Sequence, residues 1–269
     1  MANDQPGTTG PSTPLPFVAA TFQLPLGTSQ IACSVPVPAG PIGMTQLIPS
    51  LHHLSNTLTA AATDLTASQA APVSCRKGCS ACCRQLIPLT LYEAEALADA
   101  IHSLPPQSQA LLEARFEEAL RQLSPSGLLP RLDPERLPPP HSPEREQLAL
   151  DYLAQRVDCP FLEDDACTIH PIRPLVCREY LVTSPAAHCV APTPETVARV
   201  PLPVSLSQHL ANYARRQTAL PAGWFPLIHL FAWMRRRTAP IADTLTPGPL
   251  LLEALLLDRS PAISPPSPL

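Results

Sequence analysis

The run Cys75-Arg76-Lys77-Gly78-Cys79-Ser80-Ala81-Cys82-Cys83 places four cysteines within nine residues of the chain. Three more follow downstream, at Cys159, Cys167 and Cys177. Thiolates are soft ligands that select zinc, Cu(I) or iron–sulfur clusters over magnesium or calcium. Ligands from two distant segments would also hold those segments together, so a bound metal would stabilise the fold. The sequence therefore predicts a metal-binding protein whose fold is tied together at its cysteines.

The spacing of the cysteines suits metal coordination. Two or three intervening residues let a turn direct two thiolates at one ion, as in zinc knuckles and iron–sulfur loops. Gly78 supplies the backbone freedom that a tight ligand loop needs. Cys189, which follows His188, is as consistent with a free thiol as with a ligand, and Cys33 is left outside the site. The candidate metal ligands are Cys75, Cys79, Cys82, Cys83, Cys159, Cys167, Cys177 and Cys189.

The chain offers more thiols than one simple site uses. A structural zinc ion or one [4Fe–4S] cluster takes four ligands. Three explanations stay open: one site with spare thiols, two sites, or one site beside a reactive thiol. Because Cys82 and Cys83 are adjacent, they point in different directions, and we expect one of them to serve a second metal or to lie outside the coordination shell. The surplus favours an iron–sulfur cluster over a plain zinc site.

Basic residues lie close to the cysteines in the sequence. Cations near a thiolate site offset its negative charge and lower thiol pKa values. His170 is open to two interpretations, since imidazole can bind zinc or iron or act as a hydrogen-bond partner. The basic residues expected to surround the site are Arg76, Lys77, Arg84, Arg173 and Arg178.

The apolar spacing predicts a mainly α fold with irregular cysteine-rich metal-binding loops between short helices. A first helix is expected over 44–65, with Ser50 as the alternative start because Pro49 lies in its first turns. Thr90 and Glu93 form a capping-box pattern that opens a helix to about residue 103, and Ser142-Pro143 is a helix start. No alternating strand of useful length is evident. The other helices are expected near 107–123, 174–181, 205–218, 224–237 and 249–258.

Proline defines the expected domain organisation. The chain has thirty-seven prolines, which crowd the two ends and the stretch 125–143. Residues 1–42 lack a sustained apolar period and are expected to form a disordered Pro-rich tail. Residues 43–240 should form a helical domain that contains the cysteine region, about 70–190. Residues 241–269 should hold a C-terminal helix and a second Pro-rich tail.

Charge and hydropathy patterns bear on location and partners. The first residues show no positively charged stretch followed by an apolar core, so we expect no secretory signal. The most apolar segments, 226–234 and 249–257, are shorter than the ~20 residues of a bilayer span, so no membrane partner is expected. The cytoplasm, where thiols stay reduced, is the expected compartment. The arginines of the C-terminal half lie among apolar helix positions, and we expect them to pair with the acidic middle of the chain rather than to bind nucleic acid.

In combination, three motifs resemble a known family. They are Cys75-x3-Cys79-x2-Cys82-Cys83, Cys159-Pro160-Phe161-Leu162, and Cys167-x-Ile169-His170-Pro171-x-Arg173-Pro174-x2-Cys177-Arg178. Together with the segment 89–93, they make residues 70–190 similar to the YkgJ-type cysteine-cluster proteins, which are described as zinc- or iron-chelating. The resemblance implies metal binding.

Two classes of function follow from these observations. The first is a cytoplasmic binding protein that chelates iron, as an iron–sulfur cluster or iron ion, or alternatively zinc; a protein partner is compatible with it but is not identified. The second is a metal-dependent redox or protein-modifying enzyme, because a similar motif occurs in flagellin lysine N-methylases, where an iron–sulfur cluster is implied. Methyl transfer needs a place for S-adenosylmethionine, and the chain has no GxGxxG loop for a nucleotide. An enzyme would also need a pocket beside the metal.

Overall fold

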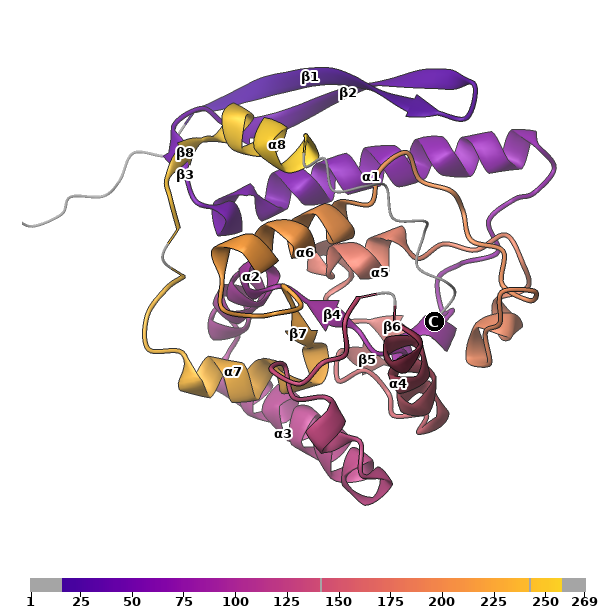
Figure 1. Cartoon of the computed structure of the whole chain (residues 1–269), viewed down its shortest axis with the longest axis vertical. Helices are drawn as coiled ribbons and strands as arrows, with labels where there is room; N and C mark the ends of the chain where they lie inside the picture. Colours follow the sequence, from indigo (N-terminus) through magenta and orange to yellow (C-terminus); the bar gives the residue numbers. More distant parts are fainter. Residues whose placement is uncertain (1–15, 141, 242, 258–269) are drawn as a thin grey trace, which may run out of the picture.

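The computed structural model describes residues 16–140, 142–241 and 243–257. As expected, this part of the chain is mainly α-helical, with cysteine-rich loops between the helices (Figure 1). Its eight α-helices are α1 (Met44–Ser68), α2 (Leu91–His102), α3 (Pro106–Leu123), α4 (Pro143–Ala154), α5 (Leu175–Glu179), α6 (Leu206–Gln217), α7 (Leu230–Arg236) and α8 (Gly248–Leu256).

The strands of the described residues form four separate antiparallel pairs. Only the first pair is long, and the other three join segments that lie close to the helices. The pairs are β1 (Phe17–Leu26) with β2 (Ser29–Pro38), β3 (Pro41–Ile42) with β8 (Thr246–Pro247), β4 (Pro88–Leu89) with β7 (Phe225–Pro226), and β5 (Leu162–Glu163) with β6 (Ala166–Cys167).

The β1–β2 hairpin corrects the expectation of disorder for this part of the N-terminal region. Its strands pair from Phe17 opposite Pro38 to Leu26 opposite Ser29, and Gly27 adopts a positive φ of 61° in the two-residue turn. Cys33, Val35 and Val37 on alternate positions of β2 are buried against α1. The hairpin tolerates its prolines because each strand of a two-stranded pair is an edge strand. Residues 1–15 lie outside the described residues.

Helix α1 is the centre of the main core. The hairpin and α8 cover one side of it, and α2, α5 and α6 lie on the other (Figure 1). The expected start at Met44 is confirmed and the alternative at Ser50 is wrong, because the helix continues through Pro49. Met44, Leu47 and Ile48 are almost fully buried, and this packing offsets the backbone hydrogen bond that Pro49 removes.

Two smaller cores position the segments that carry the cysteines. Leu123 of α3 and Leu148 of α4 lie in one core. Phe116, Phe161 and Phe231 form the centre of the other, with ring centroids 5.4 Å apart for Phe116 and Phe161 and 4.9 Å apart for Phe116 and Phe231. Because Phe161 lies two residues after Cys159, this aromatic cluster fixes the loop between α4 and α5.

The expected pairing of C-terminal arginines with the acidic middle of the chain is confirmed at α7. Arg235 forms an ion pair with Glu113 of α3 at 2.6 Å, and Arg237 pairs with the buried Glu95 of α2. These contacts hold α7 against α2 and α3. Within the described ranges, no helix combines the length and apolar character needed to span a bilayer.

Candidate metal centre

Three segments bring the cysteines to one region. The first is the loop between α1 and α2, which contains a short 3-10 helix, η1 (Ala81–Arg84). The second joins α4 to α5 and contains the β5–β6 pair and the 3-10 turn η4 (His170–Ile172). The third is the 3-10 helix η5 (Ala186–Val190), which contacts η1. Helix α5 itself carries Cys177.

Hydrogen bonds join these segments without using any thiol. The Cys159 N–H donates to the Cys83 carbonyl at 2.8 Å. The Ser80 hydroxyl donates to the Asp165 carboxylate at 2.6 Å, which links the first loop to the β5–β6 turn. The Ser74 N–H donates to the Val182 carbonyl at 2.9 Å, which links it to the segment after α5. The backbones that bear the cysteines are therefore held together by the protein itself.

The short helix α5 is fixed at its start by Glu93. This buried carboxylate accepts hydrogen bonds from the Leu175 N–H at 2.8 Å and from the Thr90 N–H and hydroxyl at 3.1 and 2.8 Å. The predicted capping box of α2 is confirmed, and its carboxylate also caps α5. The first N–H groups of a helix lack partners within the helix, so Glu93 satisfies both helix starts with one side chain.

The residues that follow Cys177 anchor α5 at its other end. The Arg178 guanidinium donates to the Asn56 side chain of α1 at 2.9 Å and to the Arg173 carbonyl at 3.1 Å. The Glu179 carboxylate accepts from the Ser207 N–H and hydroxyl at 3.0 and 2.6 Å, at the start of α6. Both side chains are buried. Cys177 is thus held between α1, α2 and α6.

The eight candidate ligands form one network of interacting thiols. Burial and then the neighbouring Cys159, Cys82 and Cys167 raise the pKa of Cys177. Burial raises the pKa of Cys159 to about 12. The pKa of Cys82 is raised first by the hydrogen bond that its thiol donates to Cys83 and then by burial. Members of the network from all three segments are Cys75, Cys79, Cys82, Cys83, Cys159, Cys167, Cys177 and Cys189.

Cys33 lies apart from this network. It is buried in the main core on β2, and burial alone raises the pKa of its thiol. The structure therefore agrees with leaving Cys33 out of the site, although the reason is a packed strand and not a disordered tail.

Arg173 is the cation most closely associated with the thiols. The thiols of Cys75, Cys82, Cys167 and Cys177 all have raised pKa values, and the positive charge of Arg173 opposes that rise. Its Nε atom is buried and has no hydrogen-bond partner among the described residues. A buried donor without an acceptor is costly, and thiolates close to it would supply both an acceptor and a compensating charge.

The other basic residues contribute unequally. Arg178 also acts on Cys167. Arg84 instead forms an ion pair with Asp158 at 2.7 Å, and Arg76 and Lys77 are exposed. His170 is exposed at the start of η4, and the nearby Arg173 charge lowers its pKa.

The chemistry of the donor set fits a thiophilic metal. Besides eight thiols, the site offers backbone N–H groups to the sulfur atoms, from Phe161 to Cys159 and from Ile169 to Cys167. Hydrogen bonds of this kind favour the thiolate, which is the form that binds metal. Among the residues that the structure describes, no three His, Cys, Asp or Glu side chains are arranged to hold an ion as they stand. Binding would therefore need rotation of the thiols in addition to their deprotonation.

Sequence reasoning missed three residues beside Cys189: Tyr180, which contacts its thiol, and Gln85 and Arg199, which contact Tyr180. The Tyr180 hydroxyl hydrogen-bonds to the Cys189 thiol and accepts from the Gln85 side chain at 3.2 Å. The Arg199 guanidinium lies 4.9 Å from the centre of the Tyr180 ring. The position of Tyr180, three residues after Cys177, was the sequence signal that it lies near the site. Its partners come from two other segments, and the sequence does not pair them.

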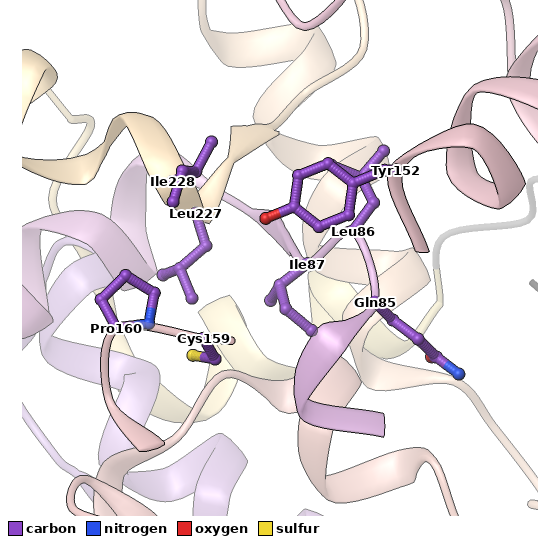
Figure 2. A pocket seen from close by; sticks show the side chains of 8 residues that line it. All are labelled: Gln85, Leu86, Ile87, Tyr152, Cys159, Pro160, Leu227 and Ile228. Atoms are coloured by element: carbon purple, nitrogen blue, oxygen red, sulfur yellow. The ribbon is translucent and has the colours of Figure 1, made fainter. Parts of the chain in front are cut away.

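Two cavities lie near the site. Figure 2 shows a small one of about 10 Å³, which Cys159 lines together with Tyr152, Ile87 and Leu227. The Gln85 side chain points away from it in this view. A larger, mainly apolar cleft of about 540 Å³ lies between α2, α3 and residues 161–172. No cysteine lines this larger cleft.

Comparison with known proteins supports the cysteine motif. Residues 74–193 match the CxxCxxCC family model, whose description is "Putative zinc- or iron-chelating domain". The matched segment contains all eight candidate ligands. No curated protein and no solved structure matches the chain.

Proposed function

We propose that this protein binds zinc or iron through the thiolates of its cysteine cluster, because residues 74–193 match the CxxCxxCC family model. One observation carries the proposal: cysteines from three segments interact in one partly buried network, with Arg173 among them. Thiolates in this number select thiophilic metals. Arg173 supports the proposal because its charge offsets that of the thiolates.

The bound metal would connect segments that lie far apart in the sequence. Cys79, Cys167 and Cys189 come from three different segments, so an ion that bound across them would add cross-links to the hydrogen bonds already present. We propose a reducing compartment, the cytoplasm, as the location, because thiols must stay reduced to bind metal. An iron–sulfur cluster, which the surplus of thiols favours in the sequence, stays a prediction alongside zinc.

The enzyme alternative needs a substrate pocket that opens on the metal. The cavity at Cys159 has room for about one water molecule, and the larger cleft has no cysteine in its lining. Neither cavity supports a substrate beside a thiol. A binding protein is therefore the function that we propose.

The experiment that tests this function is metal analysis of protein purified without oxygen. Zinc, iron and inorganic sulfide are measured together with the visible absorption spectrum. Iron with sulfide and a broad band at visible wavelengths would identify an iron–sulfur protein, whereas colourless protein with zinc would identify a zinc protein. The matched control is Cys33→Ser, which removes a thiol outside the cluster and should keep the metal.

A second variant completes the test. Cys177→Ser removes a thiol at the centre of the anchored helix α5 and should lose metal. The proposed function would be contradicted if the unmodified protein contained no more zinc or iron than the Cys177→Ser variant.

A further inference from the structure

The larger cleft, between α2, α3 and residues 161–172, has an apolar floor. Leu97 and Ile101 of α2 and Phe161 line this floor, and each is at most 2% exposed. All three belong to the core that contains the aromatic cluster, so their positions are fixed by packing. The volume of about 540 Å³ lies within the range of pockets that bind small molecules. The cleft therefore has both the size and the rigid apolar base of a ligand site.

Exposed apolar side chains form the rim of the same cleft. Leu104, Leu111 and Ile172 line it, and they are 40%, 61% and 39% exposed. Large apolar side chains scattered singly over a surface need no explanation, whereas a contiguous group of them marks an interaction site. These three come from the turn after α2, from α3 and from η4, and the fold brings them to one place. The rim is therefore such a group.

The polar side chains of the cleft are engaged within the protein. Arg115 of α3 pairs with Glu163 of β5 at 2.8 Å, so the two charged residues among those described in the lining neutralise each other. The Thr168 hydroxyl donates to the Phe161 carbonyl at 3.0 Å, and Ser108 is exposed to solvent. The lining that the structure describes thus leaves no uncompensated charge for a charged ligand.

We propose that this cleft binds an uncharged apolar small molecule. Removal of apolar surface from water would drive its binding, and the floor and the rim both offer such surface. A carboxylate or an ammonium group would lose its water without gaining a free opposite charge, and burying a charge without a partner is costly. The site goes beyond the proposed metal binding, since no cysteine lines it.

The depth of the cleft favours a small molecule over a second copy of this chain. The floor residues are almost fully buried, whereas the rim residues are well exposed. A partner surface would therefore need a protruding apolar group to fill the hollow. A small molecule fills it without one.

The first test measures binding of an uncharged fluorescent probe, N-phenyl-1-naphthylamine, to the full chain purified without oxygen. The fluorescence should rise and saturate at one probe per chain. Ala100 lines the cleft, whereas Ala114 is exposed on α3 outside the lining. Ala100→Phe should weaken binding by about tenfold or more, the cost of losing contact with two methylene groups, and the matched Ala114→Phe should leave it unchanged. No saturable binding, or equal binding by the two variants, would overturn the proposal.

A third variant keeps this test decisive. Leu111→Lys places a charge at an exposed rim position, which the fold tolerates, and should also weaken probe binding. Circular dichroism confirms that each variant folds. If Ala100→Phe does not fold, unchanged probe binding by Leu111→Lys would overturn the proposal in its place.

The second test determines which head group the cleft accepts. Decan-1-ol, decanoate and decylamine compete with the probe at neutral pH, each below the concentration at which it aggregates. The alcohol should displace the probe at a concentration about tenfold lower than either charged compound, because only they bury an unpaired charge. A preference for decanoate that Arg115→Gln abolishes would overturn the uncharged class. A preference for decylamine that Glu163→Gln abolishes would overturn it equally.

Sedimentation of the unmodified chain tests the alternative occupant. The association state should be the same for the unmodified chain and for Leu111→Lys, with and without the probe. A dimer that the probe or Leu111→Lys dissociates would show that the cleft is an interface between two copies, and it would overturn the proposal.

Discussion

Glu93 connects α2 to the cysteine-bearing helix α5, and its replacement by alanine tests how that connection supports the metal site. Its carboxylate accepts three hydrogen bonds, two from Thr90 and one from the Leu175 N–H. Burial raises the pKa of Glu93, and these hydrogen bonds oppose the rise. The cost of burying this carboxylate is therefore offset by its three donors and by the nearby Arg178 charge.

The magnitude follows from those hydrogen bonds. Each hydrogen bond to a charged group contributes about 1.5 kcal/mol or more to the free energy of unfolding. The alanine variant also avoids the cost of burying the Glu93 charge, which offsets part of the loss. We expect Glu93→Ala to lower the free energy of unfolding by about 3 kcal/mol. Glu93→Gln keeps an acceptor for Leu175 but turns an amide N–H toward the Thr90 N–H, so its loss should be smaller, about 1.5 kcal/mol.

The assay is urea denaturation of metal-loaded protein, followed by circular dichroism, with Glu253→Ala on the exposed face of α8 as the control. The control should change stability by less than about 0.5 kcal/mol. Because α5 carries Cys177, Glu93→Ala should also release metal to a chelator faster than the control does. The reasoning is refuted if Glu93→Ala matches the control, or if Glu93→Gln costs as much as Glu93→Ala.

Three further predictions concern pH, backbone geometry and metal. Burial and then the Arg178 charge lower the pKa of His52 from 6.5 to about 4. The free energy of unfolding should therefore fall, by up to about 3 kcal/mol, as the pH falls through this interval. His52→Gln should remove that part of the acid dependence, as measured by urea denaturation. Gly223 has a φ of 74°, and an added Cβ would lie 2.0 Å from the Ala211 carbonyl oxygen. Gly127 has a similar φ of 70°, but nothing lies within 4 Å of its added Cβ. Gly223→Ala should therefore lower the melting temperature much more than Gly127→Ala, and equal losses would contradict this explanation. Excess zinc should raise the melting temperature, since a ligand at 100 times its Kd stabilises the folded state by about 2.7 kcal/mol; an unchanged scanning-calorimetry midpoint would contradict it.

Helix starts could be predicted from the sequence where the side chain of a nearby residue caps them. Thr90 and Glu93 start α2 as expected, and the Ser142 side chain accepts the Arg145 N–H at the predicted start of α4. Such capping acts over three residues and is visible in the sequence. The second role of Glu93, at Leu175, joins positions 82 residues apart. Nothing local in the sequence indicates that contact.

The hairpin was missed because two signals in the sequence conflict. Cys33, Val35 and Val37 alternate with small or polar residues, which indicates a strand, but the prolines around them indicate disorder. The structure shows why the alternation prevails: the alternate residues bury against α1. Burial against a distant helix is a tertiary effect, and residue-by-residue propensity does not include it.

The cysteine cluster could be predicted as a set but not in its internal order. The motif spacing singled out seven of the eight candidate thiols, and Cys189 was left open between a ligand and a free thiol. The spacing did not indicate that Cys75 and Cys189 pack in one cluster around Val182. That order depends on the folded positions of η1, α5 and η5. The helices around the site, and not the spacing of the motif, determine it.

The hydrogen bonds that join the cysteine segments have a consequence for binding strength. Cys159 N–H to Cys83, Ser80 to Asp165 and Ser74 to Val182 hold the segments close before any ion arrives. Once one thiolate has captured an ion, the remaining thiolates reach it as an intramolecular step, at an effective concentration in the millimolar range or above. The fold thus extends the chelate effect to thiolates outside the nine-residue run Cys75–Cys83, which an isolated peptide of that run would lack.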